Sequence, residues 1–271
     1  MSPVHRGIRP LVAALLVLAG VGSPALAQED GALPGVPVAG AASPPASAAP
    51  PPFRSAADSV AWERAREAAL GAPGRRLVVS IRERRVRWMD GERVLFEAPV
   101  AVGKGTRLAD GRRVWDFSTP RGVRRVTGKQ ENPVWTPPDW HYVELARDSA
   151  YRVVYLQRGR SVPVGGGKRL EVRGDRVVEV RPDGRAETIP ADEEVIYGRT
   201  LYVPPLGTAN RRIPGELGNH KLDLGDGYML HGTPHQDSIG TAATHGCIRL
   251  RDADVLYLYE NVPVGTPVHL F

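Results

Sequence analysis

The residues best suited to chemistry are gathered near one end of the chain. The sequence contains a single cysteine, Cys247, and three of its seven histidines, His231, His235 and His245, lie in the 16 residues before it. A thiol attacks carbonyl groups as the thiolate, and a neighbouring imidazole can take its proton near neutral pH. This grouping predicts a cysteine nucleophile served by a histidine base.

Two neighbours of the cysteine fit the same chemistry. Gly246 allows close backbone approach, so the amide groups of residues 246 and 247 could face an oxyanion. Arg249 lies two residues after Cys247, and in an extended segment its side chain would project to the same side as that of Cys247. There it could bind a carboxylate or fix the loop.

The same residues leave two other interpretations open. Histidine and cysteine are also zinc ligands, and His231 and His235 have a feasible spacing for a zinc pair. Against a zinc-binding, non-catalytic module, Pro234 disfavours the helix that usually presents such a pair. The other alternative is a buried structural cysteine beside structural histidines.

The segment resembles the signature of the L,D-transpeptidases of the YkuD type, the cysteine enzymes that cross-link bacterial peptidoglycan. That signature is His-Gly-Thr, a spacer, and then Ser or Thr followed by His-Gly-Cys-Ile-Arg. Here it runs from His231 to Arg249, with Thr244 at the Ser/Thr position. The resemblance covers about residues 75–130 and 200–271, including Gly103-Lys104-Gly105 and Thr119-Pro120-Arg121-Gly122.

The resemblance implies a fold and a reaction. The fold is a mostly β, β-sandwich-like catalytic domain at 75–271, with a short capping helix after the cysteine and an inserted β-rich segment at about 141–199. The reaction is acyl transfer on peptidoglycan stem tetrapeptides through a Cys247 thioester, which releases terminal D-Ala and passes the acyl group to an amine of a neighbouring stem. No metal and no organic cofactor are required.

The resemblance also implies roles for individual residues. His231 matches the general base, His245 lies near the oxyanion site or steers the acyl donor, and Gly246 supplies an amide group. The expected substrate-binding or supporting residues are Arg249, Thr244 and Thr233. Water as acceptor would make the protein an L,D-carboxypeptidase or cross-link hydrolase, and a protein lysine would make it attach an envelope protein.

The N-terminal region predicts export. Residues 1–27 combine a basic start, an apolar run and the small-x-small site Ala25-Leu26-Ala27, which together are typical of a signal peptide. Their apolar run is shorter than the ~20 residues that a bilayer core requires. Residues 28–57 are rich in Ala and Pro and are expected to form a disordered linker. The expected location is the periplasm or cell envelope, with no stable membrane span after cleavage.

The remaining pattern predicts the elements that must position the cysteine. A short helix is expected over about 56–70, within a segment placed at 58–74, with Ser55 or Asp58 as its cap. Period-two patterns predict strands at 77–81, 84–89 and 93–102, and further hairpins around Gly174-Asp175 and Asp183-Gly184. A helix at 253–261 capped by Asp252 and a strand at 268–271 follow the cysteine.

Composition limits the other possibilities. With 30 Gly and 25 Pro among 271 residues, the chain is neither a coiled coil nor a helical bundle. The net charge of +6 suits an anionic neighbour such as a cell-surface polymer, but no nucleic-acid motif accompanies it, so nucleic acid is not an expected partner. A lone cysteine makes an intramolecular disulfide impossible.

Overall fold

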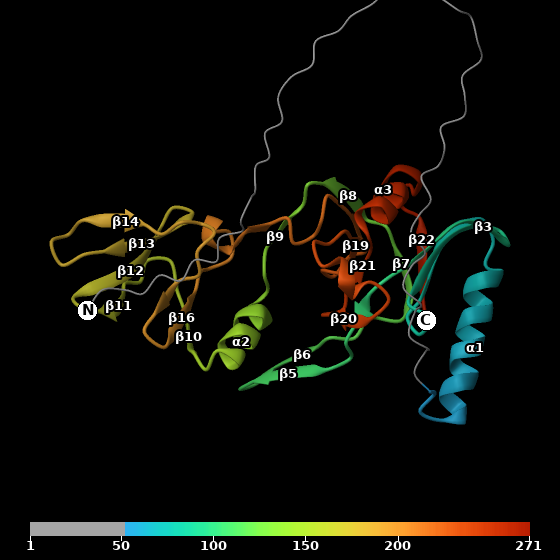
Figure 1. Ribbon diagram of the computed structural model, residues 1–271, viewed down its shortest axis with the longest axis horizontal. Helices are drawn as coiled ribbons and strands as arrows, with labels where there is room; N and C mark the ends of the chain where they lie inside the picture. The colour runs from blue at the N-terminus through green and yellow to red at the C-terminus, as the bar shows by residue number, and fades with distance from the viewer. Residues whose placement is uncertain (1–51) are drawn as a thin grey trace, which may run out of the picture. The chain divides into compact units, whose positions relative to one another are not determined.

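The computed structural model describes residues 52–271 (Figure 1). The predicted signal peptide at 1–27 and residues 28–51 of the predicted linker at 28–57 lie outside the described residues. Within the described part, no helix combines the length and the hydrophobicity needed to cross a bilayer.

Helix α1 (Ala56–Gly71) precedes the sheets and packs on the first of them (Figure 1). Its cap is Ser55, whose hydroxyl accepts a hydrogen bond from the Asp58 amide at 3.1 Å. The buried guanidinium of Arg76 donates to the backbone carbonyls of Ala69, at 2.8 Å, and Leu70, which satisfies the helix C-terminus. Because the helix ends at Gly71, residues 72–74 of the predicted helical segment are not helical.

The first sheet contains both the first and the last strand of the described residues. Its strand order is β3-β2-β1-β22-β7, with β1 and the C-terminal strand β22 parallel. The predicted hairpin is present, and Gly91 takes the positive φ of 54° in its turn. The strands are β1 (Arg75–Ser80), β2 (Arg85–Asp90), β3 (Arg93–Pro99), β7 (Gly122–Arg125) and β22 (Pro267–Leu270).

The second sheet carries residues of the predicted active site. Its order is β21-β19-β18-β8, formed by β21 (Ile248–Arg249), β19 (Met229–His231), β18 (His220–Asp223) and β8 (Gly128–Glu131). One hydrophobic core joins the two sheets, because Leu77 and Val86 of the first belong to the same cluster as Leu230 and Ile248 of the second. The predicted mostly β, sandwich-like architecture is confirmed.

Helix α3 (Asp252–Asn261) follows the second sheet, as predicted, and buries Val255 and Leu258 in the shared core. The prediction that Asp252 is its cap was wrong, because Asp252 is the first helical residue and Arg251 is the cap. The Asp252 carboxylate instead packs against the backbone of Gly218 and Gly232, where any side chain would collide with it.

The segment predicted as a β-rich insertion contains a helix that the sequence did not indicate. Helix α2 (Asp139–Asp148) has no side-chain cap and is held by the buried residues Tyr142, Val143 and Ala146. Two sheets follow it, with orders β10-β16-β15 and β11-β12-β13-β14, and both predicted hairpins are present in the second. The strands are β10 (Arg152–Tyr155), β11 (Val162–Gly165), β12 (Lys168–Arg173), β13 (Arg176–Val180), β14 (Ala186–Thr188), β15 (Ile196–Tyr197) and β16 (Thr200–Val203).

Short strand pairs connect these sheets around the cysteine. In the parallel pair β4–β20, Gly103 lies opposite Thr244, and a Cβ at Gly103 would collide with the backbone of residues 117–119. Glycine is therefore needed there for close approach. The pairs are β4 (Val102–Gly103) with β20 (Ala242–Thr244), β5 (Arg107–Asp110) with β6 (Arg113–Asp116), and β9 (Val134–Trp135) with β17 (Ile213–Pro214); the 3₁₀ turns are η1 (Ala209–Arg211) and η2 (Gln236–Ser238).

Candidate active site

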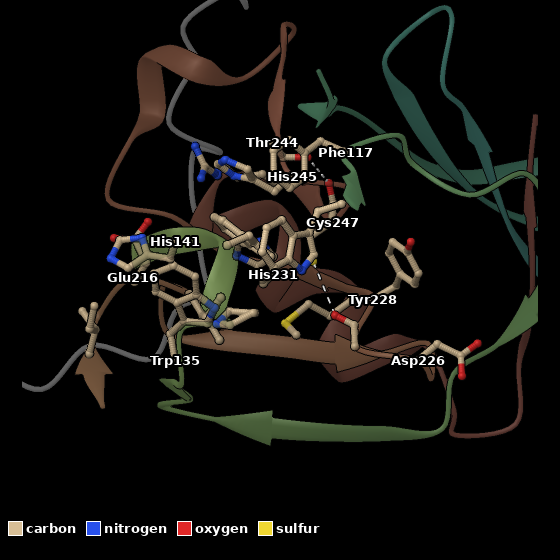
Figure 2. Close-up of a pocket in the computed structure, with 18 of the residues that line it drawn as sticks. Phe117, Trp135, His141, Glu216, Asp226, Tyr228, His231, Thr244, His245 and Cys247 are labelled. Carbon is tan, nitrogen blue, oxygen red and sulfur yellow. Dashed lines mark hydrogen bonds between the residues drawn. The ribbon is translucent and has the colours of Figure 1, made fainter. Parts of the chain in front are cut away.

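Most of the predicted site residues surround one cavity of about 800 Å³ (Figure 2). Of these residues, the cavity is lined by Cys247, His231, His245, Thr244 and Arg249. Gly246 and Thr233 are buried and are not among its lining residues. The fold thus brings both ends of the motif to one place.

Strand alternation separates the core residues from the cavity residues. The neighbouring strands β19 and β21 are parallel, with Leu230 opposite Ile248 and His231 opposite Arg249. Leu230 and Ile248 are fully buried in the core. Because successive side chains point to opposite faces, His231, Arg249 and Cys247 share the other face, which lines the cavity.

His231 is buried and carries its lone pair on a defined nitrogen. Its Nδ1 lies 2.6 Å from the backbone oxygen of Gly232. A carbonyl oxygen can only accept, so Nδ1 carries the proton and Nε2 is the basic atom. Burial lowers the pKa of His231 to about 4, so the imidazole is neutral at neutral pH.

Cys247 holds a protonated thiol in the resting protein. Burial raises the pKa of the thiol to about 11, although the Met229 backbone amide and the positive charge of Arg249 oppose this shift. The Sγ atom lies 3.7 Å from the Gly227 carbonyl oxygen, which accepts a weak hydrogen bond from it. The pair is therefore a neutral thiol and a neutral base rather than a preformed ion pair.

Thr244 holds the turn that presents the cysteine. Its buried hydroxyl donates to the Cys247 carbonyl at 2.6 Å and accepts from the Gly246 amide at 3.2 Å. Gly246 has a φ of 122°, and a Cβ there would lie 2.9 Å from the ring of Tyr228. The oxyanion role of Gly246 and the substrate role of Thr244 stay predictions, because both groups are engaged with the turn here.

Replacing Thr244 with valine is expected to weaken this turn. The Thr244→Val side chain keeps the shape but leaves the Cys247 carbonyl and the Gly246 amide without their partner, which costs about 1–3 kcal/mol of unfolding free energy. Denaturant unfolding measures the loss. Thr241→Val is the matched control, because the Thr241 hydroxyl also donates to a carbonyl, at 2.7 Å, but is exposed. Equal stability of the two variants would contradict the assigned role.

Thr233 lies beneath the loop, and His235 lines the cavity at a position away from the pair of Cys247 and His231 described above. Thr233 is fully buried, and its hydroxyl accepts from the His235 amide at 3.0 Å, so it supports the loop. The exposed imidazole of His235 lies 3.5 Å from a carboxylate oxygen of Glu216. Within residues 52–271, no three His, Cys, Asp or Glu side chains are grouped as a metal site, so the zinc alternative finds no support there.

Arg249 fixes the loop beside the cysteine. Its Nη1 donates to the Ser238 hydroxyl at 3.1 Å. Its backbone exchanges two hydrogen bonds with Ala101, at 2.8 and 2.9 Å. The guanidinium thus ties η2 to β21, which is one of the two roles predicted for it; carboxylate binding stays a prediction.

His245 has partners that the motif does not contain. Its Nε2 lies 2.7 Å from Oε2 of Glu144, and Oε1 of the same carboxylate accepts from Lys104 at 2.6 Å. Its ring stacks on Trp140, with centroids 4.0 Å apart. Sequence reasoning missed Glu144, which lies on α2 with no motif around it, and assigned no role to Lys104 in Gly103-Lys104-Gly105.

The sequence is similar to those of known proteins. The sequence model of the YkuD family, the L,D-transpeptidase catalytic domain, matches residues 74–270. The chain is 28% identical over 196 residues to the probable L,D-transpeptidase ErfK/SrfK of Escherichia coli, covering 72% of this chain and 43% of that protein. It is 36% identical over 80 residues to the putative L,D-transpeptidase YkuD of Bacillus subtilis, covering 27% and 49%.

Solved structures of the same kind are also found. An L,D-transpeptidase from Xylanimonas cellulosilytica aligns with a TM-score of 0.39 and 13% identity over 74% of this chain and 61% of that one. The chain spans less than half the length of the ErfK/SrfK relative. Since the family model covers most of the sequence and includes the whole motif, the chain belongs to the L,D-transpeptidase catalytic-domain (YkuD) family.

Proposed function

We propose that this protein is an exported cysteine L,D-transpeptidase that acts on peptidoglycan stem tetrapeptides. One observation carries the proposal: the Cys247 thiol and a neutral His231 with its lone pair on Nε2 share one face of adjacent strands and line one cavity. This is the arrangement of a nucleophile with its general base. The names of the relatives, probable and putative L,D-transpeptidases, support the reaction class.

The first step forms a thioester. Nε2 of His231 takes the thiol proton as Sγ of Cys247 attacks the carbonyl that joins the third stem residue to terminal D-Ala. The C–N bond then breaks, the departing amine takes the proton from His231, and D-Ala leaves. Since the thiol pKa is about 11 and the imidazole pKa about 4, proton transfer accompanies attack rather than preceding it.

The second step transfers the acyl group. The amine of a neighbouring stem attacks the thioester carbonyl and gives up a proton to His231. The C–S bond breaks and the thiolate regains a proton from the imidazolium. Amide groups near Cys247 would bind the oxyanion in both steps, with Gly246 the candidate donor once its bond to Thr244 is exchanged.

The charges around the cavity suit a substrate that carries both positive and negative groups. Within the described residues, its lining includes the carboxylates Asp116, Glu216 and Asp226 and the guanidinium of Arg249. A stem peptide offers carboxylates, and a stem with a diamino residue also offers an amine. Arg249 is the group proposed to meet a substrate carboxylate, while the carboxylates favour approach of a cationic amine.

The proposed location is the periplasm or cell envelope, with residues 1–27 as the signal peptide and 28–57 as a linker. The support is the sequence pattern of these residues, together with the net charge of +6, which suits an anionic wall polymer. Peptidoglycan stem peptides are the proposed partner, and no metal or organic cofactor takes part in the proposed steps.

Product analysis tests the acceptor. The purified protein is incubated with disaccharide tetrapeptide monomers, and the products are separated and identified by mass. Transfer to an amine is expected to yield free D-Ala and cross-linked dimers. Tripeptide monomer without dimer would replace the transpeptidase proposal with an L,D-carboxypeptidase, and the absence of both products from folded protein would contradict acyl transfer.

A further inference from the structure

The imidazole of His245 is held by groups that lie outside the cysteine motif. Glu144 on α2 approaches its Nε2 at 2.7 Å, and Lys104 Nζ lies 3.1 Å from the same nitrogen. Trp140 stacks on the ring face, and Phe117 meets it edge-on with centroids 4.6 Å apart. The ring therefore has a fixed plane and a fixed partner for one nitrogen.

Two contacts make opposite demands on Nε2 of His245, because the Glu144 carboxylate can only accept a hydrogen bond and the Lys104 ammonium can only donate one. Glu144 is held as the carboxylate by its hydrogen bonds from Lys104, at 2.6 Å, and from His245, which outweigh burial and lower its pKa. The contact with the carboxylate is the shorter of the two, 2.7 Å against 3.1 Å, and the Lys104 ammonium already donates to Glu144 at 2.6 Å, so we assign the proton to Nε2 of His245. In the neutral ring, Nδ1 is then the unprotonated nitrogen.

We propose that Glu144 is a positioning residue that holds His245 with its proton on Nε2, so that Nδ1 serves acyl transfer as a hydrogen-bond acceptor. This inference rests on the proposed function, which it deepens by dividing the work between the two motif histidines. His231 carries the lone pair that deprotonates the thiol. His245 offers an acceptor to an N–H group of the acyl donor or of the incoming amine.

The helix that carries Glu144 gives the segment after Trp140 a defined role. Helix α2 also supplies Trp140 to the ring face of His245, and both Trp140 and His141 line the cavity beside Cys247. The segment predicted as an insertion therefore begins with the element that orients a motif residue. It is connected to the site through side chains rather than attached as a decoration of the surface.

Four charged or titratable groups face His245. Burial lowers its pKa, the Glu144 carboxylate raises it, and Lys104 and Arg249 lower it. His141, on the same face of α2, is itself shifted to a lower pKa by burial and by His245. Burial together with Lys104 and Arg249 outweighs Glu144, so His245 is a neutral ring at neutral pH, which the acceptor role requires.

Nitrogen-15 NMR of the imidazole side chains tests the tautomer directly. In the wild-type protein the His245 proton is expected on Nε2. Glu144→Ala should mix the two tautomers and lower the pKa of His245, since the carboxylate that raises it is gone. Glu144→Gln should keep the tautomer, because its amide oxygen still accepts, but should lower the pKa. Lys104→Met should shift the pKa in the opposite direction.

Asp148→Ala is the matched control, because Asp148 is an exposed carboxylate in the last turn of the same helix. It should leave the His245 spectrum unchanged. Thermal unfolding of each variant separates a local effect from loss of fold. A wild-type proton on Nδ1, or an unchanged tautomer in folded Glu144→Ala, would overturn the proposal.

The rate of acyl transfer supplies the second readout. Glu144→Ala is expected to lower it by between about tenfold and 100-fold, by analogy with the loss of the hydrogen-bond partner behind a metal-bound histidine. Glu144→Gln should recover much of that loss. Full activity in Glu144→Ala would overturn the role in transfer. If the wild-type protein showed no acyl transfer, the proposed function would fail while the spectra still decided the tautomer.

Discussion

Cys247→Ala is expected to abolish covalent acylation of the protein by a carbapenem. In the wild-type protein the thiol is expected to open the lactam ring, so that the whole mass of the drug is retained as a single thioester adduct. Alanine offers no nucleophile, and removal of a catalytic nucleophile lowers rates by more than about 1000-fold. Intact-mass spectrometry of both proteins after the same incubation measures the result.

The fold of the variant is expected to survive. Cys247 is half-buried and open to the cavity, and its turn is held by the Thr244 hydroxyl through backbone groups that Cys247→Ala keeps. Circular dichroism and thermal unfolding check this. An adduct that persists in Cys247→Ala would place the nucleophile elsewhere. Folded wild-type protein without any adduct would count against the enzyme, and zinc content would then decide the alternative of a metal-binding module.

The sequence predicted the parts of this site that depend on local order. Strand alternation predicts that the side chains of Arg249 and Cys247 point to the same side, and in the structure both residues line the cavity. The turns at Gly91 and Gly174 have the positive φ angles of 54° and 59° that these glycines allow. Such features depend on a few adjacent residues, so a single sequence is enough to find them.

The sequence could not predict contacts made between distant segments. Glu144 lies 101 residues from His245 and 40 from Lys104, and no spacing rule connects them. The helix that carries Glu144 is only 10 residues long and lacks a side-chain cap, so packing rather than propensity stabilises it. Asp252 was misplaced as a cap for a related reason, since its position is decided by the close backbone of Gly218 and Gly232.

These distant contacts also separate the two motif histidines, which the sequence alone could not rank by protonation. Each is neutral because burial lowers its pKa, yet the proton sits on Nδ1 of His231 and on Nε2 of His245. The difference arises from the acceptors, a backbone carbonyl in one case and the Glu144 carboxylate in the other. Equivalent residue types in one motif thus acquire different roles from their surroundings.

His231→Ala is expected to lower the rate of acylation by about 100-fold to 10,000-fold, the range for loss of a general base. His235→Ala should cost little, because that exposed imidazole contacts the Glu216 carboxylate and the backbone amide that bonds to Thr233 is kept in the variant. Acylation rates with a carbapenem, followed by intact mass, compare the variants. Equal losses would contradict His231 as the base and favour a shared metal site.

The dependence of the acylation rate on pH tests independently whether His231 is the general base. His231 is basic only when unprotonated, so the wild-type rate should fall as the pH drops through its pKa of about 4 and stay level above it. A preformed thiolate–imidazolium pair would instead lose activity at alkaline pH as well, where the imidazolium gives up its proton, so a level rate above the acid limb separates the two arrangements. In His231→Ala the fall in rate at acid pH that the imidazole causes should be absent. The rate should then follow the thiolate population and rise about tenfold per pH unit until the thiol pKa of about 11 is approached. A wild-type limb near the ordinary histidine pKa of 6.5 would show that His231 is not held in the buried, neutral state from which its role as base is argued.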